Sequence, residues 1–103
     1  SLQPDAAFEA ASHLRFTQQI ILIDADIKNQ VIAVEIQDPE FFVGQRIFCF
    51  IEVQDFSDDD VLIALNAIRD KTALHDGQHI FFYNAAGQGR IQIHVVHGKI
   101  FHG

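Results

Sequence analysis

The chain has 103 residues, of which 49% are hydrophobic and 20% charged. This length and composition predict one folded domain spanning residues 1–103, and they exclude an intrinsically disordered chain. Asp and Glu number 14 against 7 Lys and Arg, so the formal net charge is −7. That excess disfavours binding to nucleic-acid phosphates or anionic lipids, and no apolar run approaches the ~20 residues of a membrane helix. We therefore expect a protein partner, a basic one in particular, and neither nucleic acid nor membrane.

The single cysteine, Cys49, lies inside the apolar run 47–51. One cysteine cannot form an intramolecular disulfide, and apolar neighbours raise the pKa of a thiol and suppress its reactivity. We therefore expect a reduced core residue and a cytoplasmic location. The three serines lie outside any Gly-x-Ser-x-Gly nucleophile motif, and no cofactor motif is present, so we predict no cofactor.

The first half of the chain predicts one short helix and two strands. Residues 4–11 are typical of a helix, because proline and an acid suit its first turn and alanine is the best helix former. Residues 17–27 alternate with period two, and the pattern resumes after the polar turn 28–30. The residues expected on the buried face of this hairpin are Ile21, Ile23, Ala25, Ile27, Ile32, Val34 and Ile36.

The third predicted strand covers about residues 45–54 and is apolar on both faces. One face is expected to carry Ile47, Cys49, Ile51 and Val53, and the other Phe48 and Phe50. A strand that is apolar on both faces is typical of the centre of a sheet. Phe41 and Phe42, just after Pro39, form a further aromatic pair ahead of it.

A second helix is predicted to begin at Ser57, an N-cap residue followed by an acidic first turn, Asp58, Asp59 and Asp60. Its buried stripe is expected to contain Val61, Leu62, Leu65 and Ile68, with Ala64 beside them, and its end is expected between Thr72 and Gly77. Strands follow over 78–83 and 90–96, separated by the loop 84–89. A turn at residues 97–98 is expected to lead into a short last strand over 99–102.

These elements predict the α+β class, with an antiparallel sheet of five to six strands, the order α-β-β-β-α-β-β-(β), and helices on one face. Phe48, Phe50, Phe81 and Tyr83 then lie on the other face, so either the sheet closes into a small barrel or that face packs against a partner. The part of this order that runs strand-strand-strand-helix-strand-strand resembles that of the five-stranded oligonucleotide- and oligosaccharide-binding barrel. It also resembles the order in type III secretion chaperones, which are acidic and dimeric, although their C-terminal helix has no counterpart here.

Six histidines are the remaining candidates for chemistry, because imidazole binds metals and transfers protons near neutral pH. A site built from His79 and His94 on adjacent strands, completed by Asp76 or His102, is geometrically possible. Their sequence spacings match no metal-ligand motif, so we interpret them as exposed strand and turn residues and predict no metal site.

Two functional hypotheses follow. The first is a non-enzymatic protein-interaction module, such as an adaptor, chaperone or inhibitor, that forms a homodimer through the apolar second face of the sheet. The second is a small histidine-containing enzyme that binds a metal or ligand. For the first, the acidic segment 58–60 caps the helix and also offers a surface to a basic partner. The candidate binding residues are Phe41, Phe42, Phe48, Phe50, Asp58, Asp59 and Asp60.

Overall fold

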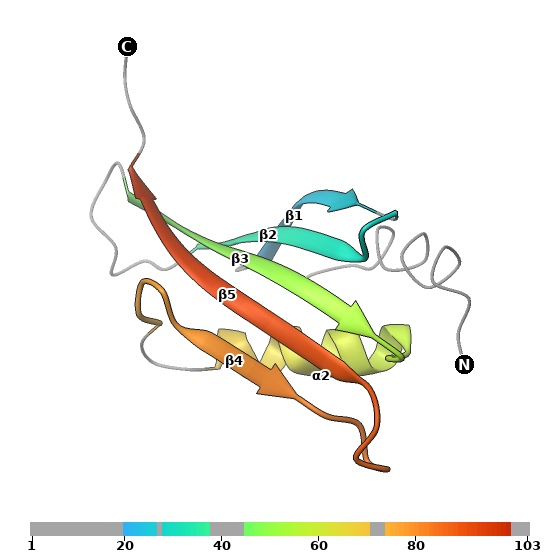
Figure 1. The fold of residues 1–103 in the computed structure, drawn as a ribbon. Coiled ribbons are helices and arrows are strands. Elements are labelled where there is room, and N and C mark those ends of the chain that lie inside the picture. Colours follow the sequence, from blue (N-terminus) through green and yellow to red (C-terminus); the bar gives the residue numbers. More distant parts are fainter. Residues whose placement is uncertain (1–19, 27, 38–44, 71–73, 100–103) are drawn as a thin grey trace.

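The computed structural model describes residues 20–26, 28–37, 45–70 and 74–99. These residues form an open five-stranded antiparallel sheet and one helix (Figure 1). The α+β class is confirmed, and the closed-barrel alternative is wrong. The helix predicted over 4–11 and the last strand predicted over 99–102, apart from Lys99, lie outside the described residues. In chain order the elements are β1 (Ile20–Asp26), β2 (Val31–Ile36), β3 (Gln45–Gln54), α2 (Asp58–Arg69), β4 (His79–Phe82) and β5 (Arg90–Lys99).

The order of strands in the sheet is β1-β2-β3-β5-β4, and every neighbouring pair is antiparallel. β3 pairs with β2 on one side and with β5 on the other, which confirms its predicted central position. Its pairing with β5 is the longest in the sheet and runs from Gln45 opposite Lys99 to Gln54 opposite Arg90. β1 and β4 are the two edges.

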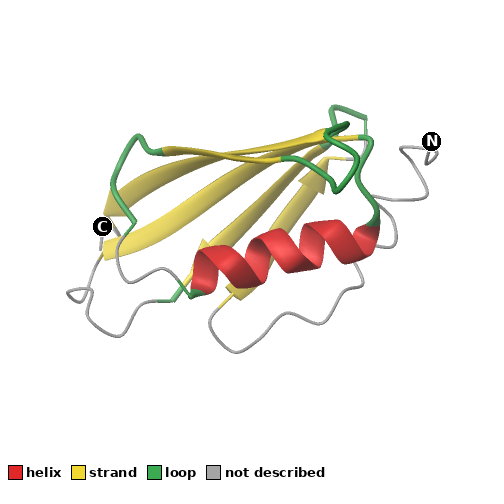
Figure 2. Cartoon of the chain, turned by 90° about the horizontal axis from the view of Figure 1, so that it is seen from below, coloured by secondary structure: helices red, strands yellow, loops and turns green. Residues whose placement is uncertain are grey.

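The described residues form two layers, because α2 packs against one face of the sheet only (Figure 2). We call this the covered face and the opposite one the open face. The alternation predicted for β2 and β3 is confirmed, since every second residue of each strand enters the core under the helix. The buried strand residues are Ile20, Ile32, Val34, Ile36, Ile47, Cys49, Ile51, Val53, Ile80, Ile91, Ile93 and Val95.

The start of α2 is the predicted one. The Asp60 N–H donates to Ser57 Oγ and the Ser57 N–H donates back to the Asp60 carboxylate, both at 3.2 Å, which forms a capping box. The helix buries Val61, Ala64, Leu65 and Ile68 and leaves Leu62 half-buried. In the part of the chain that the structure describes, no helix is long and apolar enough to cross a membrane.

The end of α2 at Arg69 comes earlier than predicted. Continued at 100° per residue, the helix would place Leu74 about 240° away from Ile68 and outside the buried stripe. Ending the helix early allows Leu74 to reach the core, where it is buried. Gly77, with φ of +78°, lies in the turn before β4 rather than at the helix end, and its N–H donates to the Val95 carbonyl at 2.8 Å.

The face predicted for the first half of β1 is wrong. Ile20 and Leu22 face the core, whereas Ile21 and Ile23 are exposed. The pairing with β2 shifts between Leu22 and Asp24, so Ile23 is an extra residue that reverses the alternation. The run 20–23 is apolar throughout, and alternation alone does not reveal such a bulge.

The turn expected at His97 and Gly98 is absent, and β5 continues without interruption to Lys99. Residues 97 and 98 pair with Ile47 and Arg46 of β3. A Cβ atom on Gly98 would lie 2.8 Å from Cε2 of the Phe48 ring. The glycine therefore provides room for that ring on the open face instead of forming a turn.

Cys49 lies at the centre of β3 with no exposed surface, and burial raises the pKa of its thiol from 9.0 to about 12. An unfolded thiol ionises near pH 9.0, whereas the folded one holds its proton until about pH 12. The stabilisation that comes from this difference in thiol pKa is therefore complete below pH 9.0 and is lost as the pH rises towards 12. We expect the free energy of unfolding, measured in urea, to fall more steeply in this interval for the wild type than for Cys49→Ala. Parallel curves would contradict this.

Candidate functional site

The open face is the surface on which the structure gathers aromatic and charged side chains, because α2 covers the opposite face. Phe48 and Phe50 of β3 point to it, as the alternation predicted. Phe50 and Phe81 remain 42% and 46% exposed. No described element packs over these rings.

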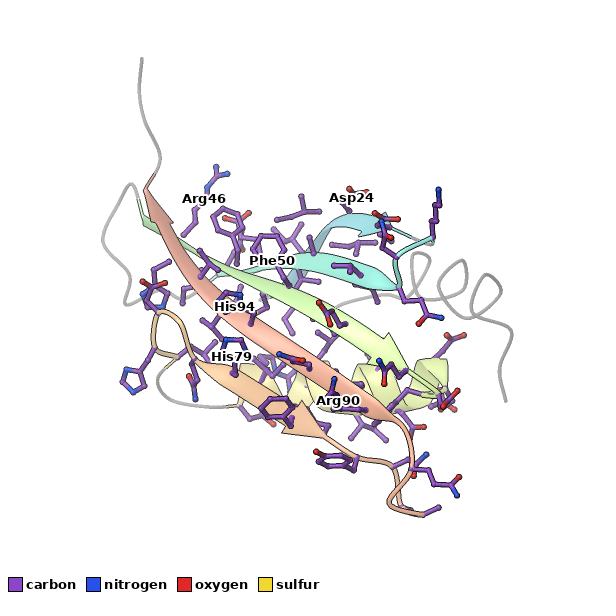
Figure 3. All side chains as sticks on the ribbon, in the orientation of Figure 1. Asp24, Arg46, Phe50, His79, Arg90 and His94 are labelled. Carbon is purple, nitrogen blue, oxygen red and sulfur yellow. The ribbon has the colours of Figure 1, made fainter. Side chains whose placement is uncertain are left out.

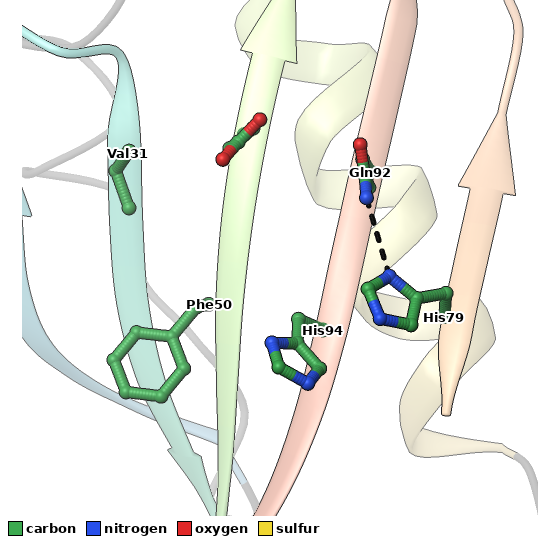
Figure 4. Close-up of a pocket in the computed structure, with 6 residues that line it drawn as sticks. Val31, Phe50, His79, Gln92 and His94 are labelled. Carbon is green, nitrogen blue, oxygen red and sulfur yellow. Dashed lines mark hydrogen bonds between the residues drawn. The ribbon is translucent and has the colours of Figure 1, made fainter. Parts of the chain in front are cut away.

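A small hollow lies on this face, across β2, β3, β5 and β4 (Figure 4). Its volume is about 160 Å³. Pockets for cofactors and drug-sized ligands occupy about 300–1,000 Å³, so this hollow suits a single side chain. It is lined by Val31, Phe50, Glu52, His79, Gln92 and His94.

The two histidines of the hollow are direct neighbours in the pairing of β4 with β5. Their rings stack with centroids 4.5 Å apart and planes 15° from parallel. The Gln92 Nε2 amide lies 3.2 Å from His79 Nδ1, which fixes the orientation of the His79 ring. The structure therefore brings His79 and His94 together on adjacent strands, the arrangement that the sequence allowed.

The stacked geometry does not suit chelation of one ion by the two imidazoles. The nitrogen lone pairs lie in the ring planes, and nearly parallel planes do not direct them to one point about 2.1 Å from both nitrogens. Asp76, the third ligand considered, instead accepts the His97 N–H at 2.9 Å, and His102 lies outside the described residues. Among the described residues, no three metal-ligating side chains gather around a common point.

Charged side chains lie on the same face of the sheet as Phe50 and the two histidines (Figure 3). Arg46 pairs with Glu35 at 3.3 Å, and the Arg90 guanidinium carbon lies 5.8 Å from the centre of the Phe81 ring. The described strands place four carboxylates on this face against those two guanidinium groups. They belong to Asp24, Asp26, Glu35 and Glu52.

Asp26 lies at the end of β1, where the chain turns towards β2. Its carboxylate accepts the Asn29 side-chain amide at 2.8 Å and the Asn29 N–H at 3.2 Å. These hydrogen bonds lower the pKa of Asp26. The open face therefore keeps its negative charge at this end of the hairpin to lower pH than an isolated aspartate would.

The structure separates the two groups of predicted binding residues. Asp58, Asp59 and Asp60 form the first turn of α2, in the layer opposite Phe48 and Phe50. Burial, followed by the charge of Asp59, raises the pKa of Asp58. The acidic turn and the aromatic pair therefore do not belong to one continuous surface. Phe41 and Phe42 lie outside the described residues.

Val31, Glu52 and Gln92 belong to the hollow but were not predicted as site residues. Glu52 could have been found, because it follows Phe50 by two positions on a strand and therefore shares its face. Val31 and Gln92 depend on how β2 and β5 align with β3, and that register is not visible in the sequence.

Comparisons of the chain with protein-family models, with curated proteins and with solved structures gave no match.

Proposed function

We propose that this protein is a non-enzymatic interaction module that binds another polypeptide through the open face of its sheet. The observation that carries the proposal is the exposure of Phe50 and Phe81 on a sheet face over which no described element packs. Exposed aromatic rings are enriched at protein interfaces, where they supply much of the binding energy. The charged groups beside them are suited to the rim and to partner selection.

The partner polypeptide can be a second copy of this chain, and such a homodimer through the open face can be tested without a known partner. A second copy presents the same apolar rings, and a two-fold axis would bring identical faces together. We expect a dimer in light scattering after size exclusion, and a mass that falls to that of a monomer with dilution. A strict monomer over a hundredfold concentration range would contradict the homodimer.

Phe50→Glu is expected to raise the dimer dissociation constant by about 30-fold or more, because it replaces a central aromatic contact with a charge that the interface must desolvate. Ile63→Glu is the matched control, since Ile63 is a 66% exposed residue of α2 in the other layer. The control should dimerise as the wild type does. If both variants dimerise alike, the open face is not the interface. Circular dichroism of both proteins verifies that the fold is retained.

A further inference from the structure

We infer that the hollow on the open face binds the guanidinium group of an arginine side chain presented by a basic polypeptide partner. This inference rests on the proposed function, because it requires the open face to be an interface. It adds the chemistry of the partner and the residues that recognise it, Phe50 and Glu52 above all.

The arginines of this face already use aromatic and carboxylate partners on the same face. Arg90 lies over the Phe81 ring, and Arg46 pairs with the Glu35 carboxylate. Aromatic faces and carboxylates are the two partners that guanidinium groups prefer in proteins. The two arginines of the described strands on this face are therefore already engaged.

The hollow offers both kinds of partner, an aromatic ring and a carboxylate, side by side. Phe50 and Glu52 are two residues apart on the same face of β3, about 7 Å along the strand. Among the described residues, no cation pairs with Glu52 or stacks on Phe50. An arginine entering the hollow could therefore lie against the ring while its fork reaches the carboxylate (Figure 4).

Two other residues that line the hollow add a hydrogen-bond acceptor and a second ring. Gln92 directs its Nε2 group to His79, which leaves its carbonyl oxygen available to an incoming donor. His94, directly opposite Phe50 in the β3–β5 pairing, adds a second aromatic ring. The hollow of about 160 Å³ suits one side-chain head, and four carboxylates against two guanidinium groups make the face attractive to a cation.

The test uses the full chain and two capped peptides of equal length and charge, hexa-arginine and hexa-lysine, titrated at low salt and followed by ¹H–¹⁵N NMR. We expect the largest shift changes at the amides of residues 50–52 and 92–94. Hexa-arginine should bind about fivefold or more tightly than hexa-lysine, because the more weakly hydrated guanidinium stacks better on aromatic rings. Titration at several protein concentrations separates peptide binding from competing dimer formation.

Variants locate the site. Glu52→Gln and Phe50→Leu should each weaken hexa-arginine binding by about fivefold or more. Asp59→Asn removes the same charge from an exposed residue in the first turn of α2 and should change the affinity less than about twofold. Equal affinity for the two peptides, absence of binding, or equal effects of Glu52→Gln and Asp59→Asn would each overturn the inference. In each of those cases, a wild-type dimer that is dissociated by the Phe50→Glu substitution would still support the proposed function.

Discussion

Leu65→Ala is expected to lower the free energy of unfolding by about 2–5 kcal/mol, because it removes a buried side chain and leaves a cavity between α2 and the sheet. Leu65 is 1% exposed and lies in the middle of the helix. A loss of this size is a large part of the stability of a small domain. Urea unfolding followed by circular dichroism measures it.

Ile63→Ala provides the comparison on the same helix. Ile63 points outward and is 66% exposed, so its truncation should change the unfolding free energy by no more than about 0.5 kcal/mol. Alanine is also the better helix former, which offsets any small loss of contact. Similar destabilisation by the two variants would mean that α2 does not pack on the sheet through the face described.

Gly89→Ala is expected to cost about 2–4 kcal/mol, through two effects at the entrance to β5. The residue has φ of +71°, a conformation that strains any L side chain. Its Cβ would also lie 2.8 Å from the Gln54 carbonyl oxygen and 3.0 Å from that of Asp55. Both atoms are backbone, so the end of β3 itself must move.

Gly87→Ala isolates the first effect, the strain of the backbone conformation. Gly87 lies in the same loop with nearly the same φ, +72°, but a Cβ there would meet nothing within 4 Å. It should cost only about 1 kcal/mol, the strain of the backbone conformation alone. Thermal or urea unfolding of both variants gives the difference, and equal costs would show that the contact with residues 54 and 55 is not close.

The sequence predicted the fold best where a local pattern had one interpretation. The bounds of β3, its two faces and the start of α2 at Ser57 are confirmed, because strict alternation and a capping box act over a few residues. The errors lie where distant contacts decide. The bulge at Ile23 depends on pairing with β2, and the continuation of β5 past Gly98 depends on pairing with β3.

The candidate site was only partly predictable for the same reason. Phe48 and Phe50 could be placed on one face by alternation within a single strand. The hollow, however, joins four strands, and the stacking of His79 on His94 follows from the register of β4 with β5. A shift of that register by one residue would place the two rings on opposite faces.

The long pairing of β3 with β5 also has a consequence for folding kinetics. These strands form the centre of the sheet, yet residues 55–89 separate them in the chain. The entropy of closing such a loop is lost before the pairing contributes stability, which slows folding. During synthesis, β3 is complete long before β5 and presents an unpaired edge until then. Between the synthesis of β3 and that of β5, the unpaired edge of β3 is therefore open to pairing with other chains.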